Sequence, residues 1–287
     1  MLGDCHIHMV LDGADYRKAL GLHRERVQED WIRARLEDYA AAGVTFLRDG
    51  GDKLGVCKRA AELAPEYGID YCTPVFPICK KGRYGGFIGR TFEDFDQYRG
   101  LVDEAERQGA HFVKIMISGL MDFDHFGQIN SVPLSRSEIG DMIAFAHDRG
   151  LSVMAHANGA QTIRDALDAG VDSIEHGAYM DAECVSQLAQ SGAVWTPTLA
   201  TIGNLIGCGR YPDSVLEPLL ALQKDNVRAC HRQGGIIAAG SDAGAYRVPH
   251  VQGLRCEIEL LAPLLGGEAP LERGEAAIRA RFFRKQA

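Results

Sequence analysis

The residues Gly3-Asp4-Cys5-His6-Ile7-His8-Met9 form a short run in which polar and apolar side chains alternate. Successive side chains of a β-strand lie on opposite sides, so the run predicts a strand with one polar and one apolar face. The expected faces are Asp4, His6 and His8 on one side, and Cys5, Ile7 and Met9 on the other. Imidazole is the commonest metal ligand among side chains, and two on one face can bind one ion. Because His-x-His alone is a weak signal, other strands must supply the remaining ligands.

Short apolar segments with strand character recur along the whole chain, and each is followed by a stretch with helical character. The eight segments are residues 3–9, 43–49, 69–78, 111–118, 151–157, 171–176, 193–199 and 235–241. Strands that alternate with helices predict parallel pairing, because a helix is the usual crossover between parallel strands. Eight such units close into an α/β fold of the (β/α)8 TIM barrel type. No linker or composition shift interrupts the pattern, so residues 1–287 are expected to form a single domain.

Several helix boundaries can be predicted from capping residues. Residues 30–42 and 92–108 have helical character, the second with Thr91 as its expected N-cap. Ser135 and Glu138 resemble a capping box, in which each side chain bonds the backbone of the other residue. After the last strand, residues 253–265 and 268–284 are expected to complete the outer layer of helices.

Composition excludes some classes of partner. The net charge of -8 argues against nucleic acid, whose binding surfaces are normally basic. The eight cysteines are dispersed without a Cys-x-x-Cys pair, as expected for reduced thiols of a cytoplasmic protein. No signal segment and no apolar stretch long enough to cross a bilayer is present, so no membrane association is expected.

Candidate metal ligands recur at the C-terminal ends of the predicted strands. Active sites of TIM barrels lie at this end of the strands. His156 and His176 each lie at the C-terminal end of an apolar segment, just before a loop that contains glycine, and Asp242 follows the last segment at the same level. A hydrogen-bonded core histidine or a helix-capping aspartate would explain any one of these residues alone. Their recurrence on several strands favours a metal site.

Lys114 is the fourth unusual position. In segment 111–118 the β-branched residues occupy alternate positions and should pack against helices, so Lys114 is expected to point into the barrel. An unpaired ammonium there is costly. Addition of carbon dioxide to the amine would give an anionic carbamate able to bridge two cations. The alternative is a salt bridge to an inward acid such as Asp4 or Asp242.

Together these residues resemble the amidohydrolase superfamily, in its branch of carboxylated-lysine enzymes related to prolidases and imidazolonepropionases. The similarity covers essentially the whole barrel. It is carried by Asp4-x-His6-x-His8, His111-Phe112-Val113-Lys114-Ile115-Met116-Ile117-Ser118-Gly119, Ala155-His156-Ala157-Asn158-Gly159, Ser173-Ile174-Glu175-His176-Gly177 and Ser241-Asp242-Ala243-Gly244.

The resemblance implies a site with two divalent metal ions. One ion would be held by His6, His8 and Asp242, the second by His156 and His176, and carboxylated Lys114 would bridge both together with a hydroxide. The mixed nitrogen and oxygen ligands favour zinc, with manganese, iron and cobalt as alternatives. The implied reaction is hydrolysis of an amide-type C–N bond in a peptide, an N-acyl amino acid or a cyclic amide, with Asp242 as catalytic proton shuttle.

The sequence departs from these relatives in two places. Members of the superfamily usually carry a small β-sandwich domain, which this chain is expected to lack. The flank that this domain covers would then be exposed, or covered by formation of a homo-oligomer. Relatives tend to show Gly-Gly-His in the third loop, where this chain has Gly85-Gly86-Phe87, so substrate choice is expected to differ.

Candidate substrate contacts lie in two loops. Arg83 and Tyr84 follow Lys80 and Lys81 in the third loop, and these cations could recognise a carboxylate on a small-molecule substrate. A solvated loop is the alternative there. Tyr246, Arg247 and His250 follow Asp242 and are further candidates.

Two other functions remain open from the sequence alone. A similar binuclear site could hydrolyse lactones or phosphoesters. The third hypothesis is a non-catalytic barrel that binds a small molecule. Loss of any of the six candidate metal ligands would favour it. A mononuclear deaminase fits less well, because such enzymes usually carry a His-x-x-Glu acid that strands five and six lack here.

Overall fold

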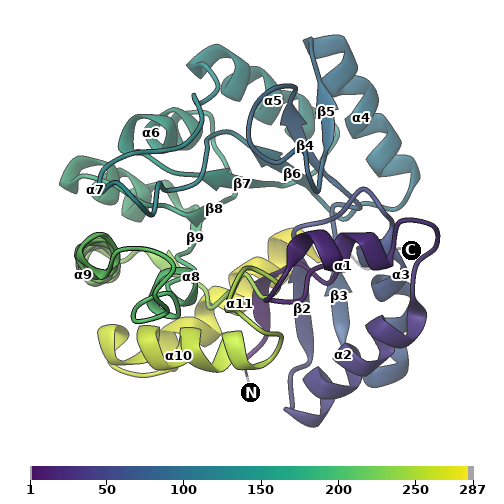
Figure 1. The fold of residues 1–287 in the computed structure, drawn as a ribbon. Helices are drawn as coiled ribbons and strands as arrows, with labels where there is room; N and C mark the ends of the chain where they lie inside the picture. The colour runs from purple at the N-terminus through teal and green to yellow at the C-terminus, as the bar shows by residue number, and fades with distance from the viewer. Residues whose placement is uncertain (1, 284–287) are drawn as a thin grey trace.

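A computed structural model describes residues 2–283 of the chain and shows the α/β architecture expected from the sequence. Short strands lie at the centre and helices surround them (Figure 1). The strands are β1 Asp4–Ile7, β2 Phe46–Asp49, β3 Asp70–Cys72, β4 Pro77–Lys80, β5 Arg90–Phe92, β6 Val113–Met116, β7 Val153–Ala157, β8 Ser173–His176, β9 Val194–Thr196 and β10 Ile236–Ile237. The helices are α1 Tyr16–Leu22, α2 Glu29–Ala41, α3 Val56–Leu63, α4 Phe95–Arg107, α5 Arg136–Asp148, α6 Ala160–Asp168, α7 Ala182–Ser191, α8 Ala200–Gly203, α9 Asp213–Arg232, α10 Gln252–Leu265 and α11 Ala269–Phe282, with a 3-10 turn at Ala64–Tyr67.

The strands pair in parallel in two sheets, β1-β2-β3 and β10-β9-β8-β7-β6-β4-β5. Backbone hydrogen bonds join these sheets in two places. On one side the amide of His111 donates to the carbonyl of Thr73 at 3.0 Å. On the other, residues 5–8 bond to residues 239–243, and we call this contact the closing seam: the amide of Asp242 donates to the carbonyl of His6 at 2.7 Å, and that of His8 to Ala243 at 2.8 Å.

Strand β1 does not keep the strict alternation that its sequence predicts. Its register against β2 shifts between Asp4 and Ile7, as at a β-bulge. Cys5 consequently packs with Phe46, Phe112 and other residues in one apolar cluster, whereas Ile7 and Met9 belong to a separate, larger one. The prediction that these three side chains share a face was wrong, because one irregular position changes the side on which the following side chains lie.

Local capping explains where helices begin. The capping box of Ser135 and Glu138 is present at the start of α5, as predicted. The expected cap at Thr91 was wrong, because Thr91 lies within β5 and pairs with Cys79. The carboxylate of Asp94 caps α4 instead, accepting a hydrogen bond from the amide of Gln97 at 2.9 Å.

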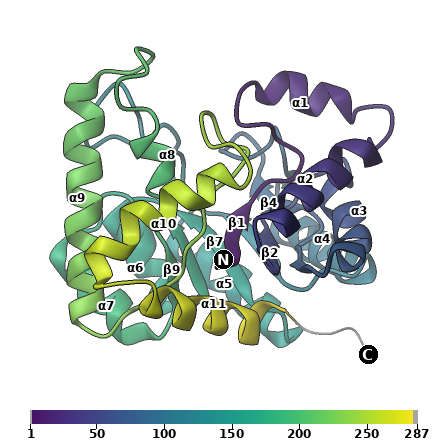
Figure 2. The same ribbon diagram turned by 90° about the horizontal axis from the view of Figure 1, so that it is seen from below.

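Helix α11 covers the end of the strands opposite the loops that carry α1 and α8 (Figure 2). Its residues Ile278 and Phe282 complete the apolar cluster that contains Cys5. Gly274 allows the close approach, since a Cβ there would overlap the carbonyl of Ile237 in β10. Residue 284, the end of the last predicted helix, lies outside the described residues. Within residues 2–283, no helix combines the length and apolar character needed to cross a bilayer.

Candidate metal centre

A cavity of about 410 Å³ opens at the C-terminal ends of the strands. This volume lies in the range of small-molecule sites. All six predicted metal ligands line the cavity, although they come from five separate strands or strand ends. These residues are His6, His8, Lys114, His156, His176 and Asp242.

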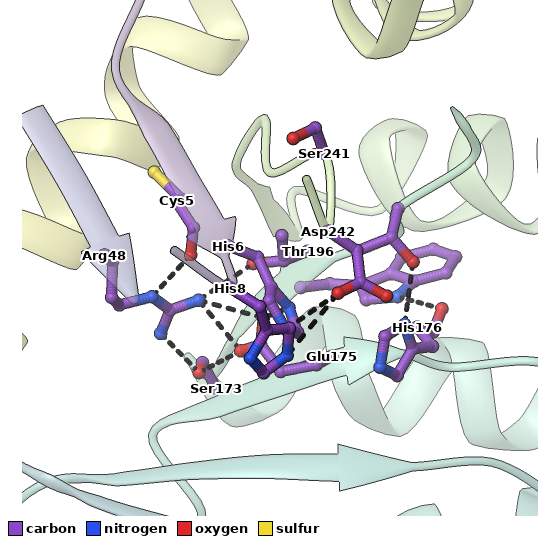
Figure 3. A network of polar contacts seen from close by, with 12 residues as sticks. Cys5, His6, His8, Arg48, Ser173, Glu175, His176, Thr196, Ser241 and Asp242 are labelled. Carbon is purple, nitrogen blue, oxygen red and sulfur yellow. Dashed lines mark hydrogen bonds and ion pairs between the residues drawn. The ribbon is translucent and has the colours of Figure 1, made fainter. Parts of the chain in front are cut away.

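His6, His8 and Asp242 form the tightest group. Their potential ligand atoms all lie within 4.8 Å of one another. The Asp242 Oδ1 atom is 3.7 Å from His6 Nε2 and 3.5 Å from His8 Nε2 (Figure 3). The closing seam produces this geometry, because it pairs the backbone of β1 with the segment that carries Asp242.

Glu175 holds the ring of His6. Its Oε2 atom lies 2.8 Å from His6 Nδ1, so the neutral imidazole donates its Nδ1–H to the carboxylate and keeps a lone pair on Nε2. Nε2 is buried and has no hydrogen-bond partner among the described residues. A lone pair that faces the Asp242 carboxylate without a cation between them is repulsive. This pair of acceptors therefore fits a bound cation.

Arg48 in turn neutralises Glu175. Its guanidinium donates to both carboxylate oxygens at 2.9 and 3.0 Å and to the carbonyl of Cys5 at 2.6 Å (Figure 3). Both side chains are fully buried. The sequence interpretation gave this pair no role. Opposite charges within two short strands were the available signal, since buried charges are normally paired.

His156 and His176 lie beside this group. Their ring centroids are 4.6 Å apart, and His176 is 5.2 Å from His6. Thr198 Oγ1 lies 2.8 Å from His176 Nδ1 and fixes its ring. His156 Nε2 lies 3.0 Å from the carbonyl of Gly119. In this arrangement one ring nitrogen of each histidine is engaged by the protein.

Two of the candidate ligands have left-handed backbones. His176 has a φ of 68° and Asp242 one of 59°, which L-residues adopt rarely. Such strain clusters at functional sites, where the surrounding structure holds it in place. At His176 the turn brings the imidazole into the cavity directly after Glu175, although neighbours on a regular strand would point to opposite sides.

Lys114 is buried, and its Nζ atom has no hydrogen-bond partner among residues 2–283. The expected alternative, a salt bridge to Asp4 or Asp242, is not formed there. Asp4 instead accepts hydrogen bonds from the amide and the hydroxyl of Ser241 at 2.8 and 2.6 Å. Burial lowers the pKa of Lys114 to about 8, against the opposing attraction of Glu175.

Burial also sets the protonation of the other candidate ligands. It lowers the pKa of His8 and of His156 to about 3 and that of His6 and His176 well below the ordinary value, so all four rings are neutral near pH 7. Burial raises the pKa of Asp242 to about 7, while Lys114 acts in the opposite direction. Neutral imidazoles and a carboxylate are ligands that zinc and similar ions accept.

The predicted substrate contacts divide into two groups. Tyr84 and Tyr246 line the cavity. Arg83, Arg247 and His250 are not among its lining residues. Both ring nitrogens of His250 are already engaged, one 3.1 Å from the hydroxyl of Tyr39 and the other 3.0 Å from the carbonyl of Leu11.

The two lysines of the third loop also face other partners. Lys80 forms an ion pair with Glu138, and Lys81 lies 2.5 Å from Glu93. The cations expected at the mouth therefore do not gather there. Phe87, at the position where relatives tend to have histidine, lines the cavity and contacts the rings of Tyr16 and Tyr84 with centroids 5.5 and 6.0 Å away.

Comparison with known proteins identifies relatives of similar architecture. An uncharacterised protein of Mycobacterium tuberculosis is 28% identical over 85% of this chain, and the ochratoxinase of Aspergillus niger is 26% identical over 96% of it. The chain spans 63% of the length of each of these relatives.

Solved structures share the fold at lower identity. The ochratoxinase of A. niger superposes with a TM-score of 0.77 at 21% identity, covering 96% of this chain and 69% of the ochratoxinase. A Xaa-Pro dipeptidase with bound methionine superposes with a TM-score of 0.73 at 21% identity, covering 98% of this chain and 72% of the dipeptidase. The sequence profile of the Amidohydrolase family matches residues 2–279. The chain therefore belongs to the amidohydrolase family.

Proposed function

We propose that the protein hydrolyses an amide-type C–N bond of a small substrate with the help of two divalent metal ions, for which zinc fits the donor set best. His6, His8 and Asp242 would hold one ion, His156 and His176 the other, and a carboxylated Lys114 would bridge them. Membership of the family supports the reaction class. The Xaa-Pro dipeptidase among the structural neighbours supports peptides as the first substrates to test.

One observation carries this proposal. Five neutral or acidic ligands converge on one cavity together with a buried lysine, and both His6 Nε2 and Lys114 Nζ lack hydrogen-bond partners among the described residues. Unsatisfied buried polar atoms are rare in folded proteins and need an explanation. Two cations and a carbamate on Lys114 would satisfy both atoms at once.

The chain's own residues suggest how the reaction would proceed. When bound, divalent ions lower the pKa of water and polarise a carbonyl. Asp242 lies at the cavity wall, where its carboxylate can accept a proton from the attacking water and return it to the leaving nitrogen. The apolar walls would exclude other water from the scissile bond.

We also infer that the strands of this chain form a single closed barrel. The family implies a TIM barrel, and the parallel strands, with backbone hydrogen bonds between the two sheets in two places, support a (β/α)8 arrangement in one domain. The small β-sandwich expected of relatives has no counterpart among the elements of residues 2–283.

Metal analysis and a substrate screen test the proposal together. Protein purified without chelator and supplied with bicarbonate should contain about two divalent ions per chain, by the two-metal logic. It should hydrolyse members of a library of dipeptides and N-acyl amino acids, and Lys114→Ala should lose both metal and activity. A library of lactones and phosphoesters is screened in parallel under the same conditions. Activity on those compounds alone would overturn the amide assignment, and one ion or none would contradict the bridging lysine.

A further inference from the structure

Arg210 is the one arginine that lines the cavity in the described structure, and Lys114 is the one lysine. The two cations differ in depth, since Lys114 is buried among the candidate metal ligands whereas Arg210 is exposed. Arg210 therefore marks the outer part of the cavity, and Lys114 its floor.

Two aromatic rings hold the guanidinium of Arg210. Its central carbon lies 4.4 Å from the ring centroid of Tyr246 and 5.2 Å from that of Tyr211, and both tyrosines also line the cavity. A cation–π contact uses the π-system of the ring and supplies no hydrogen-bond acceptor for the N–H donors of the guanidinium. The head group is thus positioned without its hydrogen-bonding capacity being used.

No acidic residue neutralises Arg210 within residues 2–283, where its guanidinium forms neither an ion pair nor a hydrogen bond. Some other arginines do find acids: Arg164 lies 2.8 Å from Asp181, and Arg149 lies 2.8 Å from Asp103. A guanidinium that lies against two rings at the mouth of an apolar cavity, without an acidic partner among the described residues, is the arrangement expected where a ligand supplies the anion.

From these contacts we infer that Arg210 binds a free carboxylate of the substrate and thereby selects acids over their neutral analogues. The inference rests on the proposed amide hydrolysis and names the substrate class: an N-acyl or peptidyl amino acid with a free carboxylate and an apolar group. A carboxylate matches one guanidinium in charge and in fork geometry. Phe87, Met116 and Leu120 supply apolar walls for the rest of the molecule.

The test compares substrates that differ only in charge. A panel of N-acetyl and glycyl derivatives of apolar amino acids is offered to the metal-loaded protein, each as the free acid and as its carboxamide. For wild type, kcat/KM should favour the acid. In Arg210→Gln that preference should fall roughly 10-fold or more, the size expected for hydrogen bonds to a charged group, with carboxamide turnover unchanged. Arg210→Lys, which keeps the charge but not the fork, should give an intermediate loss.

Arg273→Gln is the matched control, because Arg273 is an exposed arginine of α11, the helix at the opposite end of the strands. It should keep the wild-type preference. An acid preference that is unchanged in Arg210→Gln would overturn the inference and leave amide hydrolysis intact.

A binding measurement separates this inference from the proposed function. N-acetylphenylalanine and its carboxamide are titrated calorimetrically into metal-loaded wild type and Arg210→Gln. Tighter binding of the acid that disappears in the variant would support the role of Arg210 even if nothing in the panel is hydrolysed. Equal binding of acid and carboxamide, or no binding of the acid, would overturn it.

Discussion

The Nδ1 atom of His6 lies 2.8 Å from Oε2 of Glu175, and both side chains are fully buried. A carboxylate in this position fixes the tautomer and the orientation of a histidine ligand, as partners behind metal ligands commonly do. Glu175 is also the counterion of Arg48. The Glu175 carboxylate thus has two partners: it orients His6 in the candidate metal centre, and it neutralises the buried guanidinium of Arg48.

Glu175→Gln should weaken metal binding about 10-fold to 100-fold, because the amide oxygen of glutamine is a weaker acceptor for His6 Nδ1–H than the carboxylate that orients the ring. It should also destabilise the fold by roughly 3–5 kcal/mol, since Arg48 stays buried without its anion. Adding Arg48→Met removes the unpaired charge, so the double variant should regain stability but not metal affinity. Chelator competition and urea unfolding measure the two effects. Wild-type metal affinity in a stable double variant would show that Glu175 does not position His6.

Lys114→Met should separate stability from metal content. The methionine has a similar length and no amine, so the metal-free variant should unfold at the same temperature as metal-free wild type or higher, because an unpaired buried polar group costs about 1–3 kcal/mol. Bound metal should fall sharply. Lys224→Met, on α9, is the control and should change neither quantity. A clear drop in the melting temperature of metal-free Lys114→Met would mean that the amine has a stabilising partner.

Glu257 should make stability depend on pH. It is buried in α10, accepts a hydrogen bond from the amide of Ala200 at 2.7 Å, and burial raises its pKa from 4.5 to about 8. A raised pKa means that the folded protein holds a proton that the unfolded chain releases. The stabilisation is therefore full below pH 4.5 and is lost as the pH rises through 8, at up to about 1.4 kcal/mol per unit.

Glu257→Gln should remove this dependence. Urea unfolding at pH 5 and pH 8 should show that the variant gains stability relative to wild type at the higher pH. Glu259→Gln on the same helix replaces an exposed acid and should follow wild type. Parallel curves for Glu257→Gln and wild type would rule out a proton on Glu257.

Gly274→Ala tests the close contact of α11 with β10. The added methyl group would meet the backbone of Ile237 and Ala238, which cannot rotate away, so α11 must shift. The expected loss is about 1–3 kcal/mol, as for overpacking. Gly21→Ala in α1, where a Cβ has no neighbour within 4 Å, should instead stabilise by about 0.5–1 kcal/mol. Thermal unfolding measures both, and similar effects of the two changes would contradict the packing argument.

The α/β class and the convergence of the six candidate ligands could be predicted, because both follow from local patterns. His156, His176 and Asp242 end strand segments, and parallel strands bring such ends to one edge. Their roles as ligands stay a proposal. The choice of Lys114 followed from alternation in a strand that remains regular.

Other features depend on contacts that no local pattern contains. Arg48 and Glu175 are 127 positions apart, and only the packed interior makes them partners. Arg210 lines the cavity because the segment that follows α8 folds over it, whereas Arg83 in an equally promising loop does not reach it. The bulge in β1 depends on how that strand pairs with β2.

The closing seam has a consequence for synthesis on the ribosome. Asp4 and Ser241, which are hydrogen-bonded beside it, are 237 positions apart, so His6 and His8 leave the exit tunnel long before Asp242. Contacts this distant in sequence form late, because the chain between them must be ordered first. A nascent chain can thus build most of its strand and helix units while this candidate metal site does not yet exist. Capture of an ion by His6, His8 and Asp242 would therefore follow formation of the closing seam as the last step of folding. The ion would then also hold β1 of one sheet against the segment that follows β10 of the other.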